Sequence, residues 1–252
     1  FEQWIFKDVE RRNHLSRLYN DTFNCYAKKK YDGEKISLDH LNENFKLRKH
    51  QKDAIFRAIN EKNVLFDHEV GAGKTLASIC SVMKQKELGI INKPLFAVPN
   101  HLVGQWSDEF ILAYPDANLL VADEKSLSPA KRDEFFGKIM NGNYDAIIIK
   151  HSQIEKIPVP AETTKKVIDR QINELKEAIA FEEQESGNRY SLKRLETRLE
   201  GLEKKLESIV KDQNKTKSID FSDLGIDCLV VDESHMYKNL PFSTHMSAKG
   251  IG

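Results

Sequence analysis

The amino-acid sequence predicts an α/β fold in which helices cover both faces of a parallel sheet, with an antiparallel helical hairpin inserted into it. Short apolar runs rich in β-branched residues alternate with helix-like segments between residues 46 and 157, and another such run lies near residue 229. Continuous apolar strands of this kind are typical of a parallel sheet that is buried on both faces. A different pattern, with apolar residues every three or four positions, fills residues 160–215.

Composition sets the first limits on function. The chain of 252 residues carries 39 Lys and Arg against 39 Asp and Glu, so any polyanionic partner must be held by local patches rather than by net charge. Its three cysteines, Cys25, Cys80 and Cys228, are odd in number and far apart, which excludes a disulfide framework and a CxxC-type zinc site. We expect Cys80 and Cys228 to pack as small hydrophobic side chains.

The chain shows no targeting or membrane-spanning pattern. No apolar run approaches the roughly 20 residues that cross a bilayer, and the first residues lack a signal-peptide pattern. Together with the cysteine usage, this favours a soluble, cytoplasmic protein with no membrane partner. The sequence starts without Met, as is expected of a piece of a longer chain.

Three regions are expected along the chain. Residues 1–45 are polar, with scattered aromatic residues and a turn at Asp32-Gly33, and are expected to form an N-terminal helical extension. Residues 46–159 and 216–252 would form the α/β lobe, and residues 160–215 the hairpin. Within the lobe, the pattern predicts helices at residues 47–59, 76–86 and 106–112, and strands at residues 63–67, 94–99, 119–122, 145–149 and 225–232. The first helix would present on one face Leu47, Gln51, Ala54, Ile55 and Ala58.

Two heptad seams predict the hairpin. They consist of Ile168, Ile172, Leu175 and Ile179, and of Leu192, Leu195, Leu199, Leu202, Leu206 and Ile209. Residues 185–188, between the seams, have the composition of a turn. Because each apolar stripe is narrow, a projecting antiparallel hairpin is favoured over two amphipathic helices that lie flat on the sheet.

The most informative stretch is residues 64–79, where a predicted strand runs into a loop with two glycines and then into a helix. Glycine lets backbone N–H groups approach phosphate oxygens, and the helix N-terminus adds its dipole. Lys74 would reach the β- and γ-phosphates of ATP, and Thr75 would coordinate Mg²⁺. The strict P-loop pattern needs Gly at position 68, where this chain has His68. The predicted nucleotide-binding residues of the loop are Val70, Gly71, Ala72, Gly73, Lys74 and Thr75.

A later apolar run ends in two adjacent acids, Asp232 and Glu233. At the end of a strand in the same sheet, Asp232 would hold the hydrated Mg²⁺, and Glu233 would orient and polarise the attacking water. The alternative is a helix N-cap followed by a first-turn acid, which is common. The phosphate loop upstream favours the catalytic interpretation.

These residues resemble the motifs of a known family. Asp232-Glu233-Ser234-His235 resembles the Asp-Glu-x-His signature of superfamily 2 helicases and translocases. Four further segments, at residues 47–51, 68–75, 98–110 and 145–152, resemble its Swi/Snf-like branch, in the family's order. In that branch the phosphate loop does not begin with Gly, so the departure at position 68 is a family trait. The resemblance covers residues 46–157 and 219–240.

The resemblance implies the first RecA-like lobe of a DNA-dependent ATPase. Gln51 would read the edge of the adenine, and Lys74, Asp232 and Glu233 would act in ATP hydrolysis. His235 would couple hydrolysis to DNA binding, and a structural hydrogen bond is the alternative role for this side chain. The family hydrolyses ATP between two lobes, so the second lobe, with its arginine finger, would be a required partner. The isolated chain would bind nucleotide weakly and turn it over slowly or not at all.

The resemblance also implies contacts with the backbone of DNA, on a duplex and independent of its sequence. The expected contact residues are Asn100, His101, Lys150 and His151, with Lys93 and Lys238 as further candidates. Trp106, in the same segment as the first two, is expected to be a core anchor rather than a platform for stacked bases.

A narrower resemblance is to helicase–DNA methylase fusion proteins of phages and mobile elements. It rests on the first 45 residues and on Tyr237-Lys238-Asn239-Leu240. It implies a bacterial or phage-encoded, nucleoid-associated protein with a methylase domain elsewhere in the same polypeptide. The chain contains no Asn/Asp-Pro-Pro-Tyr/Phe motif, so methylation is not assigned to these residues.

Two other functions stay open at this point. A metabolic P-loop kinase would use the same loop but would not need the Asp-Glu-x-His box or the segment between Pro99 and Trp106. A nucleotide switch or interaction module without motor activity would use the hairpin as a docking arm.

Overall fold

The core of the protein is a parallel sheet. A computed structural model describes residue 4 and residues 7–24, 29–185, 189–212 and 219–238. Within these residues, β1 (Pro94–Val98), β2 (Leu119–Val121), β3 (Ala146–Lys150) and β4 (Cys228–Val231) form one sheet in the order β2-β3-β1-β4. Every neighbouring pair is parallel, and Phe96 of β1 stands opposite both Ile148 and Val230.

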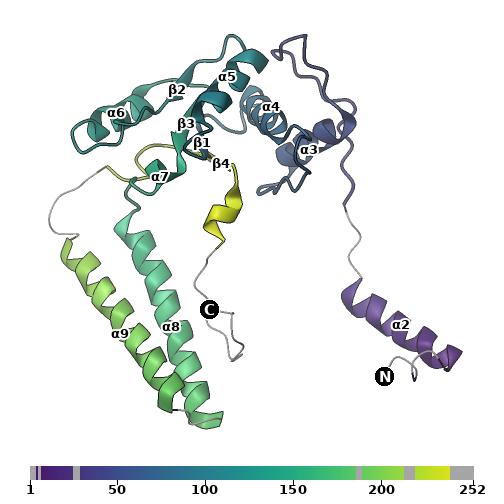
Figure 1. The fold of residues 1–252 in the computed structure, drawn as a ribbon, viewed down its shortest axis with the longest axis vertical. Coiled ribbons are helices and arrows are strands. Elements are labelled where there is room, and N and C mark those ends of the chain that lie inside the picture. Colours follow the sequence, from purple (N-terminus) through teal and green to yellow (C-terminus); the bar gives the residue numbers. More distant parts are fainter. Residues whose placement is uncertain (1–3, 5–6, 25–28, 186–188, 213–218, 239–252) are drawn as a thin grey trace.

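Helices cover both faces of this sheet (Figure 1). On one face, α3 (Lys49–Asn60), α4 (Lys74–Glu87) and α5 (Val103–Ala113) pack in a hydrophobic cluster with Phe96 and Val98 of β1. On the other face, α6 (Arg132–Asn141) and the segments around residues 157 and 224 pack with Leu95, Ile147 and Ile149. Successive strand residues point to opposite faces, so each apolar strand supplies both clusters. The predicted α/β architecture is confirmed.

The hairpin forms as its heptad seams predict. Helices α8 (Ala161–Glu185) and α9 (Arg189–Asp212) pack along each other and extend away from the sheet (Figure 1). Ile168, Ile172 and Leu175 are buried in α8, and each leucine of the α9 seam is half-buried between exposed neighbours. An ion pair from Lys176 to Glu203 (3.9 Å) links the two helices. Most of the predicted turn, residues 186–188, lies outside the described residues.

The N-terminal region has two parts. Helix α2 (Val9–Phe23) has no buried residue and lies apart from the sheet (Figure 1). Further along, the predicted turn is present, since the Ile36 N–H donates to the Gly33 carbonyl (3.0 Å). After this turn, apolar side chains pack against the cluster of α3, α4 and α5: Ile36, Leu38, Leu41 and Phe45. The last ten residues of the expected extension therefore pack with the α/β lobe.

One predicted strand is wrong. Residues 61–69 form neither strand nor helix, although a strand was expected at residues 63–67. The segment has no neighbouring strand: β4 is the edge of the sheet, and Leu65 remains 69% exposed. Instead, the Phe66 ring stacks on His68 (centroids 5.9 Å apart) and the His68 ring packs edge-on against His50 of α3 (5.6 Å). Aromatic contacts with α3 hold the segment in place of a β-ladder.

Three shorter elements were not predicted: α6, α7 (His151–Ile154) and the 3₁₀ helix η1 (Ser234–Tyr237).

Cys80 packs in the core as expected, fully buried, and this burial raises the pKa of its thiol to about 11. In the described part of the chain, no helix is both long and apolar enough to cross a membrane.

We expect Gly33→Ala to destabilise the lobe. A Cβ at position 33 would overlap the backbone carbonyl of Lys52 in α3, while the Gly33 N–H must stay bonded to Asp53 Oδ1 (2.8 Å). Relief requires a backbone shift, which costs about 1–3 kcal/mol. Urea unfolding measures the change.

The matched control is Gly137→Ala in α6, where a Cβ meets no atom within 4 Å. Alanine favours the helix there by about 0.5–1 kcal/mol, so the two variants should move the urea midpoint in opposite directions. Equal midpoints would contradict the close approach of residue 33 to α3.

Candidate functional site

The phosphate loop takes a conformation that depends on glycine. Gly71 and Gly73 both have positive φ (81° and 77°), a region in which other residues are strained. At position 73 a second constraint applies, because a Cβ there would collide with the side-chain amide of Gln51. The Ala72 N–H donates to the Glu69 carbonyl (3.2 Å) and closes a turn between them. The loop thus leads directly into α4.

The N-terminus of α4 has the features of an anion site. Its N-cap is Gly73, which has no side chain to bond the N–H groups of the first turn. Free N–H groups and the helix dipole favour phosphate at such an end. The Lys74 ammonium lies over the loop and donates to the carbonyls of His68 (2.9 Å) and Glu69 (3.2 Å). Thr75 follows in the first turn, half-buried, and Val70 is 99% exposed at the tip of the loop.

Gln51 holds the loop from the side of α3. Its Oε1 accepts from the Arg48 N–H (2.8 Å), and its Nε2 donates to the carbonyls of Ala72 (3.3 Å) and Gly73 (3.4 Å). His50 Nε2 lies 3.1 Å from the same Ala72 carbonyl, and a carbonyl only accepts, so this nitrogen carries the proton. Gln51 is 6% exposed, and both ends of its amide are occupied by backbone groups. The adenine contact expected for Gln51 stays a prediction.

The acid pair follows β4 directly. The Asp232 N–H donates to the Ala97 carbonyl of β1 (3.0 Å). Both carboxylate oxygens of Asp232 are also bonded: Oδ1 accepts from the Glu233 N–H (3.0 Å) and Oδ2 from the Trp106 indole N–H (3.1 Å). Trp106 is 3% exposed, as expected of a core anchor. Its bond to the acid could not be read from the sequence.

Glu233 has a strained backbone. Its φ of 51° and ψ of 48° make it the one non-glycine residue with positive φ among those described, a conformation that costs about 1–2 kcal/mol. The carboxylate lies 3.1 Å from His235 Nδ1, and both side chains are more than half exposed. Residues held in such conformations cluster at functional sites, and the catalytic role expected for Glu233 stays a prediction.

The predicted DNA-contacting residues lie at the same edge of the sheet, because parallel strands end together. Asn100 and His101 follow β1, Lys150 is the last residue of β3, and His151 begins α7 directly after it. His151 Nε2 bonds the Ala97 carbonyl (3.1 Å), which also accepts from Asp232. The His151 ring packs edge-on against Tyr237 of η1 (centroids 5.3 Å apart). One backbone carbonyl thus joins the acid pair to the predicted DNA-contacting residues.

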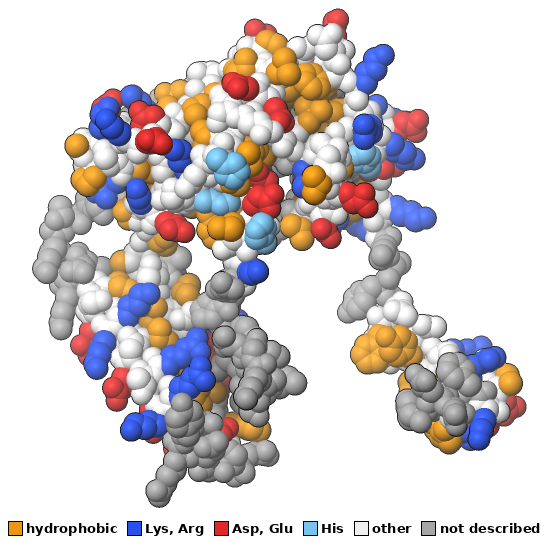
Figure 2. Space-filling model, in the orientation of Figure 1, with side chains coloured by type: hydrophobic (Ala, Val, Ile, Leu, Met, Phe, Trp, Pro, Cys, Tyr) orange, Lys and Arg blue, Asp and Glu red, His pale blue; other side chains and the backbone are white. Residues whose placement is uncertain are grey.

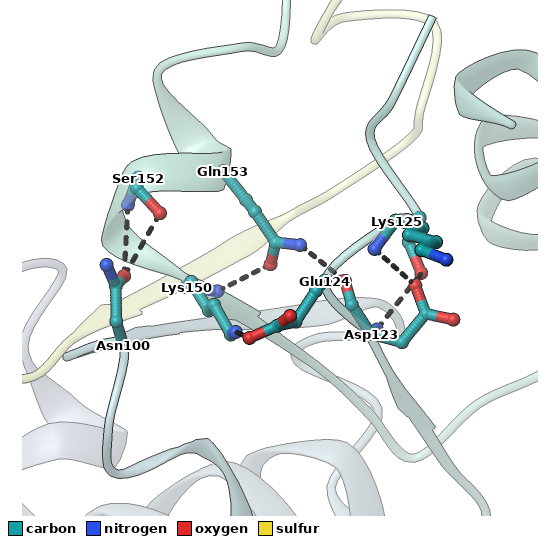
Figure 3. A network of polar contacts seen from close by, with 8 residues as sticks. Asn100, Asp123, Glu124, Lys125, Lys150, Ser152 and Gln153 are labelled. Atoms are coloured by element: carbon teal, nitrogen blue, oxygen red, sulfur yellow. Dashed lines mark hydrogen bonds and ion pairs between the residues drawn. The ribbon is translucent and has the colours of Figure 1, made fainter. Parts of the chain in front are cut away.

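Polar contacts fix this edge (Figure 3). The Ser152 hydroxyl donates to Asn100 Oδ1 (3.1 Å). Gln153, buried to 3% exposure, accepts from the Lys150 N–H (3.0 Å) and donates to the Asp123 carbonyl (2.7 Å). The Lys150 ammonium pairs with Glu124 (3.4 Å). The loops after β1, β2 and β3 are therefore cross-linked by side chains from three segments.

The predicted site residues fall into two groups. One is the phosphate loop with Gln51, and the other is the sheet edge with Asp232, Glu233 and the predicted DNA contacts. The groups share a hydrophobic cluster, in which Leu76 of α4 and Val230 of β4 both pack. No hydrogen bond or ion pair between described residues joins Lys74 to Asp232. Figure 2 shows histidine and acidic side chains close together on the α/β lobe.

The two further candidates for DNA contact, Lys93 and Lys238, lie in different places. Lys93 precedes β1, at the opposite edge of the sheet, and its ammonium donates to the Met140 carbonyl (3.0 Å). It is therefore remote from the predicted DNA contacts. Lys238 is exposed just after η1.

Comparison with known proteins identifies the family. The sequence model of a family described as a probable helicase domain matches residues 57–252. The chain belongs to this family. One similar protein is Defense against restriction protein B of Escherichia phage P1, 21% identical over an alignment of 281 positions, gaps included. The alignment covers 95% of this chain and 12% of the phage protein. The chain thus corresponds to a small part of that relative, and the helicase-related assignment comes from the family model.

We expect Glu233→Gly to be better tolerated than glycine at the next position. Glycine relieves the left-handed strain of residue 233, whereas Ser234→Gly only adds freedom to the unfolded chain. The free energies of unfolding should differ by about 1 kcal/mol, with Glu233→Gly the more stable. Urea titrations of both variants test this, and equal losses would show that residue 233 is not strained.

Proposed function

We propose that the chain is the first RecA-like lobe of a DNA-dependent ATPase of the Swi/Snf-like superfamily 2 type. The observation that carries the proposal is the Ala97 carbonyl, which accepts both from Asp232 and from His151. It joins an acid pair suited to hydrolysis to the residues expected to contact DNA. The glycine-dependent phosphate loop leads into α4, and α4 packs in the same hydrophobic cluster as Val230 of β4. A metabolic kinase would not need a link between an acid pair and residues that contact DNA.

The phosphate loop would bind ATP through the first turn of α4, through Lys74 and through Gln51. The first-turn N–H groups of α4 would donate to phosphate oxygens. Lys74 would exchange the carbonyls of His68 and Glu69 for phosphate, because a charge-assisted bond to an anion is stronger than one to a neutral carbonyl. Gln51 would have to release Ala72 and Gly73 in order to read the adenine. Loop movement and base recognition would then be linked.

The acid pair would complete the chemistry. Asp232 and Thr75 would hold a magnesium ion, and oxygen donors of this kind suit that metal. The ion would supply positive charge to balance the phosphates. Glu233, exposed next to Asp232, would hold and orient the attacking water. His235 lies 3.1 Å from the Glu233 carboxylate. It would couple hydrolysis at Glu233 to DNA binding at the edge of the sheet.

The DNA partner would be bound at the sheet edge. Asn100, His101, Lys150 and His151 offer amide, imidazole and ammonium donors, which recognise phosphate without reading bases. We infer a duplex and a sequence-independent contact. The second lobe would close over the acid pair and supply the remaining catalytic groups.

We also propose a biological setting, which the name and origin of the relative support. Its name, Defense against restriction protein B, and its phage origin support our proposal that the full-length protein acts on DNA in a phage or mobile-element context, in the cytoplasm near the nucleoid. This proposal includes a methylase region elsewhere in the same polypeptide.

ATP turnover by the full-length protein tests the nucleotide roles. Lys74→Ala should weaken ATP binding by about 10- to 100-fold, as expected for one lost charged hydrogen bond. Glu233→Gln should keep ATP affinity and lower turnover by about 100-fold or more. Unchanged affinity in the Lys74 variant would refute the loop assignment. Full turnover in the Glu233 variant would show that this carboxylate does not orient the attacking water.

Salt dependence tests the DNA-binding edge. Affinity of the full-length protein for duplex DNA should fall linearly in a plot of log affinity against log salt. Lys150→Ala should reduce the slope by about 1, through loss of one phosphate contact. Lys93→Ala, at the opposite edge, is the control and should leave the slope unchanged. The reverse result would place DNA on the other side of the sheet.

A further inference from the structure

The indole of Trp106 is a buried donor with a single acidic partner. Its N–H lies 3.1 Å from Asp232 Oδ2, and the residue is 3% exposed. The ring otherwise packs in an apolar cluster, with the Phe96 ring 5.5 Å away. An indole can only donate, and a buried donor without a partner is costly. The N–H is therefore directed to the carboxylate.

Asp232 is held at three points, and Trp106 provides the one that comes from another side chain. Its backbone N–H is fixed by Ala97, and its Oδ1 by the neighbouring Glu233 N–H. These two bonds fix the backbone and one oxygen, and the indole fixes the other oxygen. A carboxylate oxygen has two acceptor positions, so Oδ2 keeps one for a further ligand. The orientation of the remaining lone pairs is then set by Trp106.

Trp106 also belongs to the segment that leads away from the predicted DNA contacts. Asn100 and His101 lie between β1 and α5 (Val103–Ala113), and Trp106 is in the first turns of that helix. A shift of α5 relative to β4 would move the indole relative to Asp232. The indole thus links Asp232 to the segment that carries Asn100 and His101, in addition to the bond from the Asp232 N–H to the Ala97 carbonyl.

We propose that Trp106 is a positioning residue for Asp232, which sets the carboxylate for Mg²⁺ and attaches it to the segment after β1. This inference rests on the proposed function. Trp106 acts through Asp232 and does not itself contact substrate. Partners that orient a metal-binding side chain typically change metal affinity or activity by about 10- to 100-fold when removed.

The test is the Mg²⁺ dependence of ATP hydrolysis by the full-length protein. Trp106→Phe keeps an aromatic ring against Phe96 and removes only the N–H and some ring volume. The Mg²⁺ concentration for half-maximal rate should rise about tenfold. Phe110→Leu is the matched control, since Phe110 is fully buried in the same helix and also packs on Phe96. It should lower stability without changing the Mg²⁺ requirement.

A second measurement does not depend on the folding of the Trp106 variant. The chain has two tryptophans, so Trp4→Phe leaves Trp106 as its only tryptophan. In this variant of the chain, adding Mg²⁺ and ATP should change the Trp106 emission, and Lys74→Ala should abolish the change at the same ATP concentration. Nucleotide binding without any change in emission would overturn the inference.

The outcomes separate this inference from the proposed function. If the full-length protein hydrolyses no ATP, or if Lys74→Ala has no effect, the proposed function fails and the inference fails with it. If ATP is hydrolysed and Trp106→Phe keeps the wild-type Mg²⁺ requirement, only the role of Trp106 is refuted. A tenfold higher requirement in Trp106→Phe but not in Phe110→Leu supports it.

Discussion

The parallel pairing of β1 with both β3 and β4 is the constraint on which the site depends. Parallel strands end at one edge, so the loops that follow all three meet there although the acid pair lies about 80 residues beyond β3. The Ala97 carbonyl at the end of β1 accepts from Asp232 on one side and His151 on the other. An antiparallel β4 would place Asp232 at the opposite edge, beside Lys93.

The phosphate loop is fixed by a different principle, which is local and depends on α3. The positive φ of Gly73 and the amide of Gln51 in the space where a Cβ would lie make the two residues interdependent. Gln51 in turn satisfies two loop carbonyls, and Lys74 satisfies two more. The loop therefore has its own hydrogen bonds before any ligand binds. In the proposed function, phosphate would have to compete with the His68 and Glu69 carbonyls for the Lys74 ammonium.

The sequence predicts the elements that depend on a local pattern of residues. It does not predict structure that depends on contacts between residues far apart in the chain. The apolar run at residues 94–99 and the heptad seams appear as expected, since burial on both faces or along one stripe leaves a clear period. The run at residues 63–67 looks the same but has no strand beside it, so it is held by aromatic contacts to His50 instead. The bond from Trp106 to Asp232 joins residues 126 apart in the chain. No local spacing could indicate it.

The charge distribution at the sheet edge suits a reversible contact. Lys150 is already paired with Glu124 (3.4 Å), and Glu124 is 88% exposed, so the pair is screened by solvent and weak. A phosphate with better geometry could replace Glu124 at little cost, while Gln153 keeps the backbone of Lys150 in place. His151 is held differently, through its bond to Ala97 and its contact with the Tyr237 ring. A ligand that displaces His151 must therefore disturb the carbonyl that fixes Asp232, whereas one that displaces Glu124 need not. Lys150 would then contribute affinity, and His151 would transmit the contact to the acid pair.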